Sequence, residues 1–189
     1  MTLKELSPPL SEDVVADLQA GDYVSLSGII YTARDMAHKR LFELIEKGID
    51  LPVNLKGAII YYCGPTPAAP GATSGSAGPT TSNRMDMYTP ALIESTGLKG
   101  MIGKGARGAE VIAAIKKHKS VYFAATGGAG ALIARSIKSS KTECYEELGP
   151  EAIYRLEVKQ LPLLVAIDSY GNNLYELGPR AFSANKPPN

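Results

Sequence analysis

Apolar positions along the first third of the chain change between the spacing of a strand and that of a helix. Residues 22–31 begin with an apolar and polar alternation and are rich in β-formers, which predicts a strand with a bulge or a close approach of backbone at Gly28. Apolar side chains then recur at helical spacing from Asp35, a capping residue, to Gly48, which suits a left-handed helix end. The short apolar run 58–63 is flanked by glycines and predicts a buried strand.

The same alternation continues to the C-terminus. Thr89 and Pro90 form a cap followed by a favourable first helical residue, so we expect a helix that stops near Gly97. The remaining expected elements are a strand at 101–102, a helix at 109–117, a strand at 120–125, a helix at 131–138, strands at 153–158 and 163–168 joined by a turn at 160–162, and a turn at 170–173 before 174–176. This order predicts an α/β domain with an antiparallel portion near its C-terminus.

Composition limits the class of partner. The 189 residues suit one domain that buries its own core, and we expect 1–189 to form it. Lys plus Arg number 20 against 19 Asp plus Glu, and the basic residues are dispersed, which argues against nucleic acid or an anionic membrane surface. A small anion or another protein is the expected partner.

The ends of the chain and its cysteines indicate a reducing cytoplasm. Residues 1–10 hold charges and prolines where a signal peptide requires an apolar stretch, and no apolar run approaches the roughly 20 residues that span a bilayer. Only Cys63 and Cys144 are present, so neither a disulfide framework nor a metal site is expected. We interpret 1–20 as a lead-in, the small and uncharged tract 65–77 as a flexible loop, and 185–189 as a frayed tail.

Three loop segments carry residues that suit an anion. The run from Gly78 to Asp86 packs two threonine hydroxyls and Arg84 into a turn rich in glycine and proline. Similar residues recur at 32–35, which includes Arg34, and at 103–108, where Lys104 lies between glycines that allow backbone to approach a ligand closely.

Each of these features has a structural interpretation as well. Arg34 and His38 share one helix face, yet spacing alone favours a solvated arginine and a half-buried histidine. Thr80 suits a turn hydroxyl or a helix cap. The segment around Lys104 fails as a Walker loop, because Gly105 replaces the required Ser or Thr. The glycines at 127–130 fit helix–strand packing better than dinucleotide binding.

Three cations from separate loops match a dicarboxylate. Arg34 and Arg84 offer planar forks that meet both oxygens of a carboxylate, and Lys104 adds a compact charge. No paired carboxylates and no serine-histidine-aspartate order point to a hydrolase.

These segments, in this order, resemble a known family. Residues 32–38, 78–86, 103–105 and 168–172 are similar to blocks of the beta-type half of the iron-sulfur hydro-lyases, the class I fumarase and L-tartrate dehydratase family, over about 21–178. The resemblance implies an α/β fold with a mixed sheet and flanking helices, arranged as a three-layer β/β/α swivelling domain. It also implies reversible trans addition of water to fumarate, giving (S)-malate, at a 4Fe-4S cluster held by three cysteines.

The resemblance also assigns roles. It implies that Arg34, Arg84 and Lys104 bind the substrate carboxylates with His38 beside them, that Thr80 is the catalytic base, and that Thr81 assists. Two cysteines are fewer than the cluster needs, so the 4Fe-4S cluster is expected on a separate alpha subunit and no cofactor or metal on this chain. The implied assembly is a hetero-oligomer, for example two of each subunit, and the acid for the departing hydroxyl comes from the partner.

Two questions stay open at this point. Tartrate differs from malate by one hydroxyl, so an L(+)-tartrate dehydratase beta subunit is an alternative, although 32–38 and 82–86 are more similar to the fumarase side. A non-catalytic swivelling module that binds carboxylates is the alternative from another class. Which of Thr80 and Thr81 is the base is also undecided.

Overall fold

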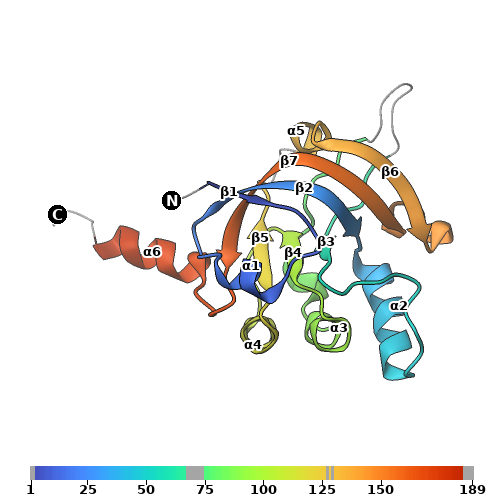
Figure 1. Ribbon diagram of the computed structural model, residues 1–189, viewed down its shortest axis with the longest axis horizontal. Coiled ribbons are helices and arrows are strands. Elements are labelled where there is room, and N and C mark those ends of the chain that lie inside the picture. The colour runs from blue at the N-terminus through green and yellow to red at the C-terminus, as the bar shows by residue number, and fades with distance from the viewer. Residues whose placement is uncertain (1–2, 67–74, 127, 129, 185–189) are drawn as a thin grey trace.

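The computed structural model describes residues 3–66, 75–126, 128 and 130–184. Most of the loop expected at 65–77 and all of the tail expected at 185–189 lie outside these residues. The helices and strands are β1 Leu3–Leu6, α1 Glu12–Ala16, β2 Tyr23–Thr32, α2 Asp35–Glu46, β3 Ile59–Tyr61, the 3-10 helix η1 Ser82–Met85, α3 Thr89–Thr96, β4 Gly100–Gly103, α4 Ala109–His118, β5 Val121–Ala124, α5 Gly130–Ala134, β6 Ile137–Cys144, the 3-10 segment η2 Glu146–Glu151, β7 Ile153–Ile167 and α6 Leu174–Ala184 (Figure 1).

The strands form one mixed sheet that closes on itself. Strands β1 to β5 pair in parallel in sequence order, and β7 runs antiparallel to β5, β6 and β2. Because β7 pairs with both β5 and β2, the strands β2, β3, β4, β5 and β7 make a closed ring. The mixed sheet with flanking helices is thereby confirmed, whereas the swivelling three-layer description stays a prediction.

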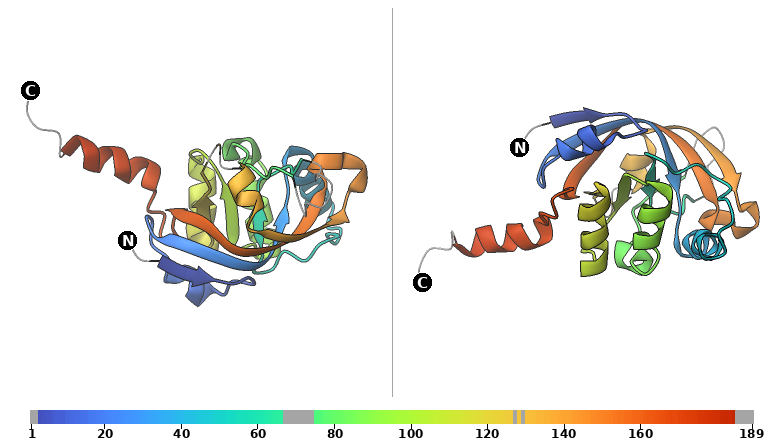
Figure 2. Two further views of the ribbon diagram at one scale, coloured as in Figure 1. Left: turned by 90° about the horizontal axis from the view of Figure 1, so that it is seen from above. Right: turned by 60° about the horizontal axis from the view of Figure 1, so that its bottom comes forward.

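The short parallel strands are buried on both faces. Ile59 and Tyr61 of β3 belong to an apolar cluster inside the ring, and the alternate residue Ile60 belongs to a second cluster under the helices. Leu41 of α2 and Leu92 of α3 pack into this second cluster. Figure 2 shows α2, α3 and α4 side by side beneath the curved strands, and this packing fixes where each helix begins.

Several expected elements are confirmed. The strand β2, the helices α2, α3 and α4, and the short strand β3 occur close to the expected positions. The register of β2 against β7 shifts between Leu26 and Gly28, but the extra residue of this bulge lies in β7; at Gly28 the chain instead makes a close approach, since an added Cβ would lie 3.1 Å from Ser7 Oγ. Gly48 and Gly97 both have the left-handed backbone expected at a helix end, with φ values of +65° and +70°. Within the described part of the chain, the helices are too short or too polar to cross a membrane.

The C-terminal third differs from expectation in three places. The two strands expected at 153–158 and 163–168 are one strand of 15 residues, β7, because the expected turn is only a bulge: Gln160 has a φ of +53° and leaves the register, and pairing with β2 continues from Leu161. The helix expected at 131–138 ends at Ala134, and the polar strand β6 takes over from Ile137. Residues 174–176 begin α6 instead of a strand.

Two caps were also predicted wrongly. Asp35 is the first residue of α2, which Arg34 precedes, and its carboxylate turns to Arg84. Thr89 lies inside α3, where its hydroxyl donates to the carbonyl of Met85 at 2.8 Å. The expected lead-in contains both β1 and α1, and β1 extends the sheet beside β2.

Candidate functional site

The anion-seeking segments meet at one edge of the sheet. Parallel strands place their carboxyl ends together, and open or closed α/β sheets bind ligands outside those ends. Arg34 follows β2 by two residues, and Lys104 follows β4 directly. The 78–86 segment joins them because Thr81 bridges Lys104 in parallel, and the amide of Thr80 donates to the carbonyl of Tyr62 at 2.7 Å.

Thr80 and Lys104 are fixed to each other through backbone. The amide of Lys104 donates to the carbonyl of Thr80 at 3.3 Å, and the amide of Ser82 donates to the carbonyl of Lys104 at 2.9 Å. Thr80 is half-buried and Thr81 exposed. Thr81 precedes η1, but its side chain makes no cap hydrogen bond, so its hydroxyl is not committed to ending that turn.

A network of ion pairs brings the two arginines together. Arg84 donates two hydrogen bonds to Asp35, one from Nε to Oδ1 at 2.8 Å and one from Nη2 to Oδ2. Arg34 Nη2 lies 3.7 Å from Asp35 Oδ2 and 3.5 Å from Glu151 Oε1. Glu151 also accepts from the amide of Met36 at 2.9 Å, so a residue 115 positions away closes the first turn of α2.

The charges of this network set the protonation of Asp35. Burial acts to raise the pKa of Asp35, but the hydrogen bonds and charge of Arg84, with Arg34 nearby, outweigh it and hold the pKa below its usual value. The carboxylate therefore stays ionised and keeps Arg84 oriented. Arg84 binds Asp35 through Nε and Nη2, so the Nη1 end of the guanidinium points away from Asp35. The Arg84 side chain is 47% exposed.

Arg34 is packed more tightly than Arg84. Its guanidinium crosses Gly64, where an added Cβ would lie 2.9 Å from Arg34 Nη1, so the close approach requires glycine. The Nε of Arg34 is buried and has no hydrogen-bond partner among the described residues. A buried donor without an acceptor is rare in folded proteins, which marks Arg34 as a candidate functional residue.

His38 lies behind Arg34 and is buried, with 1% of its surface exposed. Its Nδ1 is 2.9 Å from the carbonyl of Arg34, and its ring meets the ring of Tyr62 edge-on at 5.2 Å. Burial lowers the pKa of His38 to about 4, against the opposing effect of the Arg34 carbonyl. The ring is therefore neutral near pH 7, and its assignment as a substrate ligand remains a prediction for the assembled enzyme.

The buried state of His38 predicts an acid-sensitive fold. A histidine whose folded pKa lies below its unfolded pKa of about 6.5 stabilises the protein above that value and loses this contribution as pH falls toward 4. We expect the free energy of unfolding to drop by about 2 kcal/mol between pH 7 and pH 5. Urea unfolding of the chain and of His38→Asn across this range measures it, with His118→Asn at the surface end of α4 as the control. An equal slope in the wild type and His38→Asn would contradict the assignment.

Arg107 was grouped with the anion-seeking residues but turns inward. Its Nε donates to Asp86 at 2.7 Å and its Nη2 to the hydroxyl of Thr89 at 2.9 Å, and its guanidinium stacks over the rings of Tyr62 and Tyr122. Only 6% of Arg107 is exposed. The residue therefore anchors the turn 80–86 to α3 and α4.

The cysteines do not fit an iron-sulfur cluster. Cys63 is buried beyond β3, where burial raises the pKa of its thiol to about 12 despite the nearby charge of Arg34. Cys144 ends β6, and burial raises its pKa to about 11. In the ranges that the structure describes, no group of three or more His, Cys, Asp or Glu side chains is placed to hold a metal ion.

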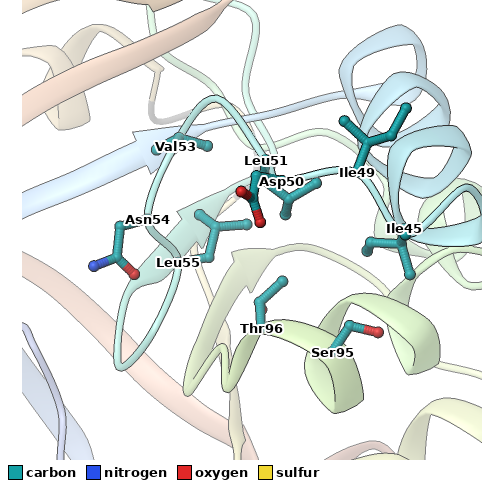
Figure 3. Close-up of a pocket in the computed structure, with 10 residues that line it drawn as sticks. Ile45, Ile49, Asp50, Leu51, Val53, Asn54, Leu55, Ser95 and Thr96 are labelled. Carbon is teal, nitrogen blue, oxygen red and sulfur yellow. The ribbon is translucent and has the colours of Figure 1, made fainter.

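A pocket of about 500 Å³ lies at another place in the fold. Its walls are the C-terminal ends of α2 and α3 and the loop between α2 and β3, including Ile45, Asp50 and Thr96 (Figure 3). Arg34 lies at the opposite end of α2, a helix of 12 residues and therefore about 18 Å long. The segments that carry Arg34, Arg84, Lys104 and Thr80 make a better candidate site for an anion than this pocket, because the described lining of the pocket contains Asp50 and no cation.

The chain matches the family model for the fumarase C-terminus over residues 2–178. It belongs to the fumarase C-terminus family. It is 40% identical over 172 residues to a putative L(+)-tartrate dehydratase subunit beta of Methanocaldococcus jannaschii, covering 88% of each chain.

Other relatives are longer than this chain and are named as fumarate hydratases. The chain is 39% identical over 176 residues to the anaerobic class I fumarate hydratase of Escherichia coli, covering 91% of this chain and 32% of that enzyme. It is 38% identical over 156 residues to fumarate hydratase 2 of Leishmania major, covering 82% of this chain and 28% of that enzyme. The chain thus spans about a third of the length of these fumarate hydratases. The names of both groups of relatives are those of hydro-lyases.

The sequence did not reveal the residues that hold the site in place. Asp35 was interpreted as a cap, and Glu151 and Tyr122 were not selected. Asp35 carried one available signal, since it directly follows Arg34 in a block selected for its charge. The others come from distant elements, so only the fold shows their contacts.

Proposed function

We propose that this chain is the beta subunit of a fumarate hydratase that interconverts fumarate and (S)-malate. The observation that carries the proposal is the convergence of Arg34, Arg84, Lys104 and Thr80 at the carboxyl ends of parallel strands in a chain of this family. Three cations at one edge match the two carboxylates of the substrate, with Asp35 offsetting part of their charge.

In this proposal the arginines bind and orient the carboxylates. Asp35 holds Arg84 side-on through Nε and Nη2, so the Nη1 end of the guanidinium points away from Asp35 and can donate to a carboxylate, and the guanidinium of Arg34 beside the same Asp35 donates the second contact. Lys104, whose backbone is bonded to Thr80, adds a point charge to the site. The same cations stabilise the additional negative charge that develops when a proton leaves C3 of malate.

Thr80 is the proposed base, with Thr81 beside it. In dehydration the oxygen of Thr80 takes the C3 proton of malate, and in hydration it returns that proton while the hydroxyl adds at C2 from the opposite face. A threonine hydroxyl is a weak base in water, so this step requires a dry site in which neighbouring cations favour the alkoxide. Thr81 is exposed and Thr80 half-buried in the chain alone, which fits a site completed by a partner.

The partner in this proposal is an alpha subunit that carries a 4Fe-4S cluster and supplies the acid. The chain has two cysteines, and their burial and separation in sequence do not suit cluster ligands. The naming of the Methanocaldococcus relative as a subunit beta supports a separate partner. A cytoplasmic hetero-oligomer, with two of each subunit, and a domain that swivels against its partner belong to the same proposal.

L(+)-tartrate is the second candidate substrate. The relative named for tartrate matches 88% of its own length, whereas the enzymes named for fumarate match over about a third of theirs. Comparing kcat/KM of the reconstituted enzyme for (S)-malate and L(+)-tartrate separates the two. A module that binds carboxylates without catalysis would bind both and convert neither.

Replacing the cations tests the carboxylate role. We expect Arg84→Ala and Lys104→Ala each to lower kcat/KM for malate by about 10- to 150-fold, since a charge-assisted hydrogen bond contributes about 1.5 to 3 kcal/mol. Steady-state kinetics of the reconstituted enzyme and thermal unfolding of each chain are measured together. Lys141→Ala, an exposed cation on β6, is the matched control. A large loss of stability with unchanged kcat/KM would show that these residues are structural.

A further inference from the structure

The turn that follows β7 is built rigidly, although it lies outside the proposed site. Asp168 is 1% exposed, and its Oδ1 accepts from the amides of Tyr170 and Asn172 at 3.0 Å. Its Oδ2 accepts from the Asn172 side chain at 2.8 Å and from the amide of Ala20 at 3.1 Å. One carboxylate therefore closes the turn and joins it to the segment before β2.

This turn fixes the start of α6. Asn173 is 6% exposed, its Oδ1 accepts from the amide of Tyr175 at 3.1 Å, and its side-chain amide donates to Glu176 at 3.0 Å. These bonds cap the first turn of the helix, which projects away from the body beyond it (Figures 1 and 2). Tyr175 belongs to that first turn, so these hydrogen bonds fix its position relative to β7.

Tyr175 reaches the loop after β4. Its hydroxyl accepts a hydrogen bond from the amide of Gly105 at 3.1 Å, and the hydroxyl of Tyr122 donates to the carbonyl of Gly105 at 2.9 Å. Because the Tyr122 proton is used there, Ser82, whose Oγ lies 2.9 Å from the same hydroxyl, is the donor in that pair. Two phenols from different elements thus hold both polar groups of one peptide residue.

Gly105 is the residue at which such a clamp matters. Its φ is +83°, a left-handed conformation that a loop adopts readily only with glycine, and it directly follows Lys104. The direction in which the Lys104 side chain leaves the backbone depends on this peptide. A lysine ammonium sits on four rotatable bonds, so a small shift at its Cα moves the charge away from Thr80.

We propose that Tyr175 is a positioning residue for Lys104, acting through its hydrogen bond to Gly105. The inference rests on the proposed role of Lys104 as a carboxylate ligand. It gives the turn 168–173 and the start of α6 a part in binding the substrate. Tyr122 holds one side of Gly105 from the core, and Tyr175 holds the other from the surface.

The clamp is tested first in the full chain without any substrate. Tyr175→Phe removes the hydroxyl that accepts from the Gly105 amide and keeps the ring. Tyr170→Phe is the matched control, because Tyr170 lies in the turn 168–173 and its described side-chain contact is through the ring, whose centroid is 5.2 Å from Lys119 Nζ. We expect amide hydrogen exchange at Gly105, followed by NMR, to quicken about three- to tenfold in Tyr175→Phe and to stay unchanged in Tyr170→Phe. Unchanged exchange in Tyr175→Phe would overturn the proposal.

The link to Lys104 is tested in the reconstituted enzyme. We expect Tyr175→Phe to lower kcat/KM for malate about three- to tenfold, and to have no further effect when Lys104 is already alanine. A normal kcat/KM in Tyr175→Phe, or an equal effect of Tyr175→Phe with and without Lys104, would overturn the positioning role. A wild-type complex without hydratase activity would instead reject the proposed function and the carboxylate role of Lys104, while exchange at Gly105 would still decide the clamp.

Discussion

Thr80→Val is expected to abolish most turnover while the protein keeps its fold. Valine has nearly the shape of threonine, and the described bonds of Thr80 to Tyr62 and Lys104 run through backbone, so the turn should persist. Removing a general base costs roughly 10²- to 10⁴-fold in rate. The reconstituted enzyme should therefore lose kcat by about that factor and still bind malate, as measured by steady-state kinetics and by calorimetric titration.

Thr81→Val is the matched comparison, because the two residues are adjacent and Thr81 makes no cap bond. We expect the smaller loss at Thr81. An inactive Thr81→Val beside a silent Thr80→Val would move the base by one residue. Normal turnover in both variants would reject a threonine base for this protein, and lowered stability with normal turnover in Thr80→Val would make Thr80 a turn residue.

The parts of the fold that the sequence predicted are those in which local and tertiary signals agree. In α3 a proline near the start and Gly97 at the end coincide with packing of Leu92 in the core. The strand β6 was missed because its residues are mostly polar and its apolar contacts come only from pairing with β7. The length of β7 was missed for a similar reason, since Gln160 and Pro162 suggest a turn, whereas Gln160 forms only a bulge and Pro162 pairs with Ser25 of β2.

The sequence predicted only those site residues whose side-chain charge or hydroxyl group can be recognised without the fold. Arg34, Arg84 and Lys104 are cations in loops that contain glycine or proline, and their order along the chain matched a known family. Their supports belong to other elements: Glu151 comes from η2, and Tyr175 comes from α6. Spacing in sequence could not show that Arg107 turns inward, because that depends on the rings of Tyr62 and Tyr122.

The same geometry is the reason for which we propose a partner. The two arginines are held by Asp35 and Glu151 at an open edge, where 47% of the Arg84 side chain is exposed. Water at such an edge keeps a threonine hydroxyl protonated and screens the cations. In the proposed assembly a second surface excludes this water, and the alpha subunit supplies the cysteines for the cluster.

The most direct test is fumarate hydration by this chain, first alone after anaerobic treatment with iron and sulfide and then mixed with a cysteine-bearing alpha-type subunit. We expect no turnover above background from either subunit separately, and formation of (S)-malate at about 1 to 10³ turnovers per second from the mixture. Adding Thr80→Val to the mixture in place of the wild type serves as the control for the site. Robust hydration by this chain alone, or an inactive mixture in which the two subunits form a stable complex with an intact cluster, would contradict a site shared between them.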